Sequence, residues 1–495
     1  MARPVLCTLL LTLALRAQVL TSQYDNARTG ANDHETTLTP TNVNSKQFGK
    51  VFSLRVDGDA YAQPLYVPNV PIPGKGTHNV LYVATEHDSV YAFDADGRTT
   101  EPLWHVSFLK RGVGTVDASD VSCFFIDPEI GITPTPTIDI ETGTLYVLAR
   151  TKESEGLLKG SGFVHRLHAL AITTGVEKFG GPTAIEPKAF NPLRQLPRAA
   201  LLLANHQVYL TWASSCDVGP YHGWVMAYDA RTLRQTAVLN TSPGEGQSGI
   251  WQSDMGPAAD ESGSVYLATG NGMFDVTSGG LDYGDSLLKL GLEGHDLQVR
   301  DYFTPADEKR LDSADLDLGS GGPMLLPGHF VLIAGKSGKL YLLDRNRMRT
   351  SLQFYNLGGR GSYSAPAFWN GHVYFLPSES RLWDFIFSNG HLTDRPNGNG
   401  ARKFGNPGAT PAISANGNTN GIVWLIETKA WNGGDKPSIL HAFDASNVAR
   451  ELYNSEENSA RDRAGLTLRF TIPTVANGRV YVGAKKEVDA YGPLH

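Results

Sequence analysis

The chain is poor in cysteine, in clustered charge and in long hydrophobic runs. It has 3 cysteines in 495 residues, and its formal net charge of −7 is spread without long runs of like charge. Nucleic acid and anionic membranes both require a basic face, so we expect neither to be a main partner. The apolar stretch at residues 5–15 is too short to cross a bilayer, which predicts that the chain has no membrane span.

Three common catalytic motifs are also missing. The sequence contains no Gly-x-x-x-x-Gly-Lys phosphate loop, no His-Glu-x-x-His zinc motif and no Gly-x-Ser-x-Gly nucleophile turn. Chemistry that depends on these motifs therefore has no support.

The N-terminus has the pattern of a secretory signal. Arg3 supplies a positive charge, residues 5–15 form an apolar stretch, and Ala17 or Ser22 is a small residue before a cleavage site. We place the signal peptide at residues 1–22 and expect a soluble mature chain that is secreted or periplasmic. Cys7 lies too early to carry a lipid on the mature chain.

Two cysteines remain after the signal is removed. In an oxidising compartment an isolated pair favours one disulfide, here between Cys123 and Cys216. The alternative is two unrelated buried thiols. No histidine or further cysteine lies at ligand spacing beside either residue, which disfavours a metal site built on this pair.

What the chain does contain is a short sequence motif that is repeated eight times. Each copy is a β-rich run, in most cases with a Tyr near its start, followed by a polar break and a second β-rich run. A repeat of strand pairs at roughly 45 to 65 residues is typical of a radial β-architecture. The copies lie at residues 79–97, 144–175, 207–233, 264–294, 330–347, 372–390, 422–447 and 479–492.

Segments on either side of this motif complete four-stranded units. A short segment with a proline, such as Ala62-Gln63-Pro64 or Thr471-Ile472-Pro473, precedes nearly every copy and suits an innermost strand. An outer strand follows most copies. The strand at 49–56 has no inner strands before it, and the last copy has no outer strand after it. We therefore predict an all-β, eight-bladed β-propeller of antiparallel blades at residues 48–495, closed by this N-terminal strand. Residues 23–47 form an extension.

Apart from the connection at 68–79, the long connections fall on one face of this ring. They join outer strand to next inner strand (109–131, 182–197, 241–253, 304–318, 455–469) or the second strand to the third (151–163, 214–222, 270–284, 428–437). In a four-stranded blade both sets emerge on the same side. Loops on a rigid scaffold are where sites are usually built, so we expect the functional site on this loop-rich face.

The repeat resembles that of the pyrroloquinoline-quinone (PQQ)-like propeller superfamily, of the secreted bacterial type. Residues 83–95, 225–230 and 440–445 carry the resemblance best, over roughly residues 48–492. It implies either a quinoprotein dehydrogenase or a non-catalytic scaffold, such as the lipoprotein of the outer-membrane assembly machinery. Such enzymes stack the quinone between a Trp and a disulfide of adjacent cysteines, and bind Ca²⁺ through Glu, Asn and Asp. Here the two cysteines are 93 positions apart, and the calcium ligands have no residue-by-residue match.

Four groups of residues on the loop-rich face are candidates for the site. Glu86, His87 and Asp88 could orient a polar ligand or transfer protons, or could form a solvated turn. Asn271, Asp282 and Asp285, with Asp275, Asp312, Asp315 and Asp317 nearby, could supply oxygens to calcium or simply be solvated. His222, Trp251 and Trp431, with Tyr221 and Trp224, could stack on a ligand or pack between blades. Lys336, Lys339, Arg360, Arg402 and Lys429 could bind an anion or remain surface charges.

Three functions remain open from the sequence. The first is an exported propeller, expected to be monomeric, that binds a small molecule, a glycan or an envelope protein on its loop-rich face. The second is a PQQ- and Ca²⁺-dependent dehydrogenase that oxidises an alcohol or sugar. The third is a non-catalytic assembly scaffold of the cell envelope.

Overall fold

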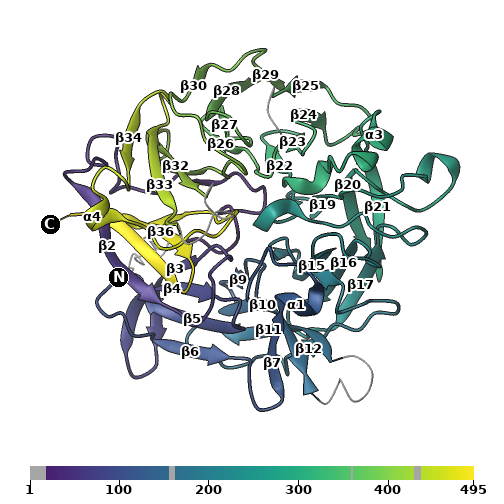
Figure 1. The fold of residues 1–495 in the computed structure, drawn as a ribbon, viewed down its shortest axis with the longest axis horizontal. Helices are drawn as coiled ribbons and strands as arrows, with labels where there is room; N and C mark the ends of the chain where they lie inside the picture. The colour runs from purple at the N-terminus through teal and green to yellow at the C-terminus, as the bar shows by residue number, and fades with distance from the viewer. Residues whose placement is uncertain (1–17, 155–161, 358–360, 429–435, 495) are drawn as a thin grey trace, which may run out of the picture.

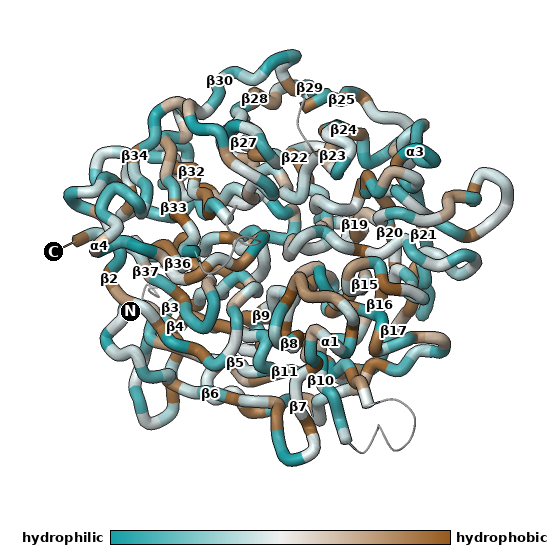
Figure 2. The backbone as a smooth tube through the Cα atoms, in the orientation of Figure 1, coloured by the Kyte–Doolittle hydropathy of each residue, from teal (hydrophilic) through white to brown (hydrophobic). Residues whose placement is uncertain are grey.

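The computed structural model describes residues 18–154, 162–357, 361–428 and 436–494, and these form a ring of eight small sheets (Figure 1). The fold is the predicted eight-bladed propeller. Most blades are antiparallel and four-stranded, and the chain builds each of the first seven from the innermost strand outward. Hydrophobic strands alternate with hydrophilic connections around the ring (Figure 2). No described helix is both long and apolar enough to cross a membrane.

The first four blades take up residues 65–303. Blade 1 has β3 (Leu65–Ile72), β4 (Gly76–Ala84), β5 (Ser89–Asp94) and β6 (Trp104–Ser107). Blade 2 has β9 (Thr137–Asp139), β10 (Thr144–Glu153), β11 (Phe163–Ala171) and β12 (Thr183–Ala184). Blade 3 has β14 (Leu202–Ala204), β15 (Gln207–Ser214), β16 (Trp224–Asp229) and β17 (Gln235–Asn240). Blade 4 has β18 (Ala258–Ala259), β19 (Val265–Ala268), β20 (Leu287–Glu293) and β21 (Asp296–Phe303).

The second half of the ring has the same order. Blade 5 has β22 (Met324–Leu326), β23 (Phe330–Ala334), β24 (Lys339–Asp344) and β25 (Gln353–Asn356). Blade 6 has β26 (Ala367–Trp369), β27 (His372–Phe375), β28 (Trp383–Ser388), and the short β29 (His391–Leu392) and β30 (Gly398–Asn399). Blade 7 has β31 (Ala412–Asn416), β32 (Thr419–Glu427), β33 (Ile439–Asp444) and β34 (Glu451–Asn454). Blade 8 has β35 (Thr474–Ala476), β36 (Arg479–Ala484), β37 (Glu487–Pro493) and β2 (Phe48–Arg55).

Short elements decorate the connections. Strands β7 (Val113–Asp117) and β8 (Glu129–Ile130) extend blade 2, and β13 (Gln195–Leu196) pairs with β15. The helices are α1 (Ala118–Val121), α3 (Glu308–Ser313) and α4 (Ser459–Asp462), with 3₁₀ turns at Gln252–Asp254, Val276–Ser278 and Leu318–Ser320.

The ring closes through the N-terminal strand, as predicted. Strand β2 pairs antiparallel with β37, from Phe48 opposite Pro493 to Arg55 opposite Glu487. Closure protects edges that an open sheet would expose. The outer strand of blade 2 is shifted along the chain: Glu177 forms only an isolated bridge to Leu170, and β12 pairs with β11 after it. The Gly-Gly-Pro run at 180–182 explains the shift, since proline cannot donate to a ladder.

At four of the blade junctions, the recurring tyrosine of the repeat joins one blade to the next. Its hydroxyl donates to a carbonyl in the turn before the outer strand of the following blade, at 2.7–3.0 Å. A buried tyrosine hydroxyl without a hydrogen-bond partner would destabilise the fold. The tyrosine side chain and its carbonyl acceptor therefore occur together at these positions. The pairs are Tyr82 with Ile172, Tyr146 with Ala230, Tyr374 with Ala445, and Tyr481 with Ala95 across the closure.

The segment from Val19 to Glu35 lies in the axial channel and contacts every blade. Val19 pairs with Tyr66 of blade 1, and β1 (Ala31–Asn32) runs parallel to β31 of blade 7. The other inner strands also bond to it. These bonds join it to Ile138, Leu203, Ala259, Leu325, Phe368 and Val475.

Candidate functional site

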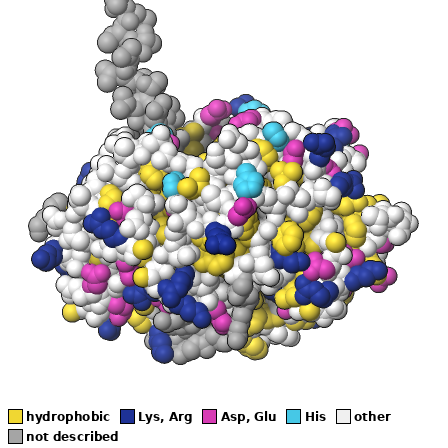
Figure 3. Space-filling view, turned by 90° about the horizontal axis from the view of Figure 1, so that it is seen from above, with side chains coloured by type: hydrophobic (Ala, Val, Ile, Leu, Met, Phe, Trp, Pro, Cys, Tyr) yellow, Lys and Arg dark blue, Asp and Glu magenta, His cyan; other side chains and the backbone are white. Residues whose placement is uncertain are grey.

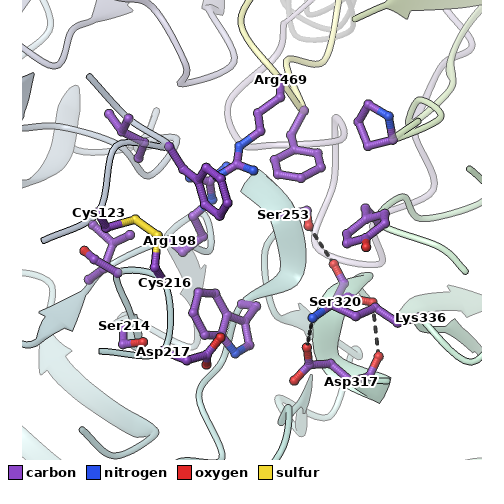
Figure 4. A pocket seen from close by; sticks show the side chains of 18 of the residues that line it. Cys123, Arg198, Ser214, Cys216, Asp217, Ser253, Asp317, Ser320, Lys336 and Arg469 are labelled. Carbon is purple, nitrogen blue, oxygen red and sulfur yellow. Dashed lines mark hydrogen bonds and ion pairs between the residues drawn. A yellow bond between two sulfur atoms is a disulfide. The ribbon is translucent and has the colours of Figure 1, made fainter. Parts of the chain in front are cut away.

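A pocket of about 320 Å³ opens on the loop-rich face, over the axis of the ring. Apart from Ser214 at the end of β15, the residues that line it belong to the two sets of connections that emerge on this face. These connections come from blades 2 to 8, so the pocket exists only once the ring has closed (Figure 4). This is the location at which the sequence places the site.

One wall of the pocket is the predicted disulfide between Cys123 and Cys216, which the structure contains. The two Cα atoms are 5.7 Å apart, and the bond spans 93 residues. It ties the loop before blade 2 to the loop between β15 and β16 of blade 3. Cys123 also packs in a small apolar cluster with Val116 and Ile126, which fixes the position of this wall.

Trp251 lies beside the disulfide wall and is held by its neighbours. The ring of Tyr221 meets it edge-on, with centroids 6.3 Å apart, and the Tyr221 hydroxyl donates to Asp217 at 2.6 Å. Gly270 lets the chain pass close by, because a Cβ there would lie 2.9 Å from Cδ1 of Trp251 and would collide with Asp317. The indole Nε1 is buried and has no hydrogen-bond partner within the described chain.

A lysine and two aspartates form the polar side of the pocket. Lys336 Nζ lies 2.5 Å from Asp317 and 2.6 Å from Asp315. Asp317 also accepts the backbone N–H of Asn271 at 2.7 Å. Burial raises the pKa of Asp317 although Lys336 opposes that rise, while the two carboxylates raise the pKa of Lys336. Asp317 is thus a buried carboxylate that binds a proton more readily than an exposed one.

The predicted group at Glu86, His87 and Asp88 does not line this pocket. Glu86 and Asp88 are fully buried, in contrast to the expected loop tip, and Glu86 accepts the N–H of Gly131 at 2.7 Å. Burial raises the pKa of Asp88 well above its usual range, with a further contribution from the negative charge of Glu86. His87 is more exposed and contacts Glu129 at 2.8 Å. These contacts connect blade 1 to the loop before blade 2.

The acidic residues predicted to bind metal use their oxygens in other ways. Asp282 accepts the backbone N–H groups of Gly244 and Glu245, each at 2.9 Å, and Asp285 accepts that of Leu318 at 2.8 Å. Within the described ranges, no three His, Cys, Asp or Glu side chains gather as ligands. Since Lys336 already occupies the position between Asp315 and Asp317, the residues present do not fit a calcium ion, and we derive no step through one.

Of the remaining predicted residues that the structure describes, Trp251 and Lys336 line the pocket, whereas His222, Lys339 and Arg402 do not. His222 contacts the carbonyl of Ser242 at 2.7 Å, Lys339 pairs with Asp307, and Arg402 pairs with Glu451. Arg360, Lys429 and Trp431 lie outside the described residues.

Sequence reasoning missed several lining residues, and a shared signal could have found them. Arg198, Ser253, Tyr363, Arg469 and Phe470 all lie just before an inner strand, several of them ahead of its proline. That register points each side chain toward the axis at the mouth of the ring.

Asp285 gives a pH-dependent prediction. Burial raises its pKa to about 8, so the folded chain holds this proton more tightly than the unfolded chain, whose pKa is about 3.9. The stabilisation is full below the unfolded pKa and is lost as pH rises through about 8. Asp285→Asn imitates the neutral acid. Urea unfolding at pH 5 and pH 9 should show that the free energy of unfolding of the variant, relative to wild type, increases by about 1–3 kcal/mol over this range. If the difference between variant and wild type is the same at both pH values, the raised pKa of Asp285 is contradicted.

The eight-bladed ring with an axial pocket on its loop-rich face has the fold of the PQQ-like propellers. No protein-family model matches the chain, and no curated protein matches it in sequence. Solved structures match its fold. It is similar to a quinohemoprotein alcohol dehydrogenase from Comamonas testosteroni (15% identity, 97% of this chain and 81% of that one, TM-score 0.65). It also resembles a europium-containing methanol dehydrogenase (12%, 97% and 99%, 0.64) and BamB from Moraxella catarrhalis (13%, 90% and 97%, 0.50). At these identities the similarity shows the fold alone.

Proposed function

We propose that the axial pocket binds a flat, aromatic, anionic small molecule, and that a tricyclic quinone of the PQQ type is its ligand. The observation that supports this most strongly is the lining of the pocket. An indole, a disulfide and cationic side chains together enclose a cavity of about 320 Å³. Aromatic faces favour planar ligands, and cations favour carboxylates. Gly270 lets Trp251 and Asp317 pack against the backbone of the pocket wall, where a side chain would collide with both. Trp251 and the disulfide would hold the ring system, and Lys336 its polar edge.

A glycan or envelope-protein ligand is less well supported. The pocket has a volume of about 320 Å³, which suits a small molecule better than a large partner. On the side of the ring shown in Figure 3, basic and acidic side chains are interspersed without a patch of one sign. A small molecule therefore remains the best match.

The binding prediction is tested with calorimetry on the purified protein and PQQ. Trp251→Ala should weaken binding at least tenfold, because it removes the stacking surface, and ring stacking with its buried area is worth about 1.5 kcal/mol or more. Trp383→Ala makes the same chemical change in β28 of blade 6, outside the pocket, and should leave affinity unchanged. Absent binding in the wild type, or equal affinity in the two variants, would refute the proposal.

Oxidation of an alcohol is the second candidate, favoured by Asp317. Its carboxylate is buried in the pocket wall, its pKa is raised, and Lys336 is within 2.5 Å. Such a group can take the proton of a substrate hydroxyl. A bound quinone supplies the oxidant for the two electrons and two protons that leave an alcohol as it becomes a carbonyl compound. Dye reduction by the PQQ-loaded protein over an alcohol and sugar panel tests this function; binding without turnover would leave a ligand-binding protein.

We also propose that the chain is exported and that its signal is cleaved after Ala17. Val19 exchanges backbone hydrogen bonds with Tyr66 at 2.8 and 2.9 Å, and Ser22 is fully buried. Cleavage after Ser22 would remove these contacts, whereas cleavage after Ala17 keeps them. The disulfide also suits an oxidising compartment. Intact-mass analysis of the exported protein should find a chain that begins at Gln18; one beginning at Gln23 would exclude this site.

A further inference from the structure

Two arginines stack among aromatic rings at one end of the pocket. The guanidinium of Arg469 lies 4.2 Å from the ring centroid of Phe125 and 5.2 Å from that of Phe470. Arg198 lies 5.2 Å from the same Phe470 ring and 5.9 Å from Tyr61. Such rings fix the plane of a guanidinium and displace water from its faces, so the group forms hydrogen bonds through its edge.

The two guanidiniums concentrate positive charge at this end. Both contact Phe470, although one precedes blade 3 and the other precedes blade 8. Both also oppose the rise in the pKa of Tyr61 that its burial causes, which places them near the same hydroxyl. Arg198 is only 4% exposed, so its charge is weakly screened by water. A cationic end in such surroundings attracts a carboxylate strongly.

The polar side of the pocket has the opposite character. Asp217, Asp315 and Asp317 line it, with Lys336 as the cation among them. Figure 4 shows Arg469 and Arg198 on one side of the cavity and the Asp317–Lys336 pair on another. This second group can exchange hydrogen bonds with a hydroxyl, as donor through Lys336 and as acceptor through Asp317. The pocket is therefore polarised.

We infer that Arg198 and Arg469 form a carboxylate subsite, and that the pocket takes a hydroxycarboxylate with its hydroxyl toward Asp317 and Lys336. This inference rests on the proposed function only in using the same pocket. A quinone that carries carboxylates offers the same anionic group to these arginines, so the test separates the two sources.

Calorimetry with gluconate, with its neutral counterpart sorbitol and with PQQ provides that test. We expect gluconate to bind the PQQ-free wild type more tightly than sorbitol, and PQQ to compete with it because both would occupy the same pocket. Arg469→Gln should weaken gluconate at least tenfold and leave sorbitol unchanged. Arg402→Gln is the matched control, because Arg402 also lies before an inner strand but pairs with Glu451 and does not line the pocket. Melting curves of both variants establish that they are folded.

The outcomes are distinct. Loss of gluconate binding in Arg469→Gln but not in Arg402→Gln supports the inference, even when PQQ fails to bind and the proposed quinone function is thereby rejected. If gluconate does not bind the wild type and Arg469→Gln weakens only PQQ binding, the arginines bind a carboxylate of the quinone. That result would overturn the inference that the pocket takes a hydroxycarboxylate. Equal affinity for gluconate and sorbitol in all three proteins overturns the subsite itself.

Discussion

Arg28→Ala should lower the free energy of unfolding by about 3–5 kcal/mol, because it removes a buried, hydrogen-bonded charge and leaves its acceptors without donors. Arg28 is fully buried in the axial channel. Its guanidinium donates to the carbonyls of Pro257 at 2.8 Å and Leu201 at 3.3 Å, and to Ser22 at 2.7 Å. Burial lowers its pKa to about 10, and the nearby Asp25 opposes that change. The arginine thus connects the N-terminal segment to blades 3 and 4.

Urea unfolding followed by tryptophan fluorescence measures this loss. Arg28→Lys keeps the charge but not the forked donors, so its stability should fall between those of wild type and Arg28→Ala. Arg231→Ala removes an exposed arginine of blade 3 and should change stability by less than about 0.5 kcal/mol. A loss below about 1 kcal/mol for Arg28→Ala would mean that the axial segment contributes little to the closed ring.

Removing the disulfide should have a similarly large effect. The double variant Cys123→Ala, Cys216→Ala should lose about 4–5 kcal/mol, since a cross-link that closes 93 residues restricts the unfolded chain strongly. The same bond joins two loops of the pocket wall, so PQQ binding should weaken as well. Reductant is the internal control: it should destabilise the wild type to the level of the double variant and leave the variant unchanged. Equal stability of wild type with and without reductant would contradict the prediction.

The sequence predicts the ring well because its signals are local. A strand alternates its side chains with a period of two residues, and the inner-strand prolines and recurring tyrosines mark the same position in successive blades. The structure gives the tyrosine its physical role, since Tyr481 of blade 8 donates to Ala95 of blade 1 across the closure. The closing strand β2 can be predicted by counting strands. One outer strand precedes the first blade, and the last blade lacks an outer strand of its own.

The site is predicted only in part. The loop-rich face, Trp251, Lys336 and the disulfide pair are all recognisable in the sequence, since unusual residues in long connections stand out. Arg198 and Arg469 are not, because each looks like an ordinary surface arginine until the ring brings both to Phe470. Glu86 and Asp88 show the reverse error: charged residues in a short loop suggest exposure, but the adjacent loop before blade 2 covers them.

By itself, the sequence determines an eight-bladed closed ring, its closing strand and the face on which the connections have lengthened, because each follows from periodic patterns within one blade. Only the tertiary structure decides two further features. One is the course of Val19 to Glu35 along the axis, where a segment without strand periodicity finds partners on every blade. The other is the polarised pocket, whose arginines and aspartates come from loops far apart in the chain. Both depend on contacts between blades, and those contacts form only when the ring closes.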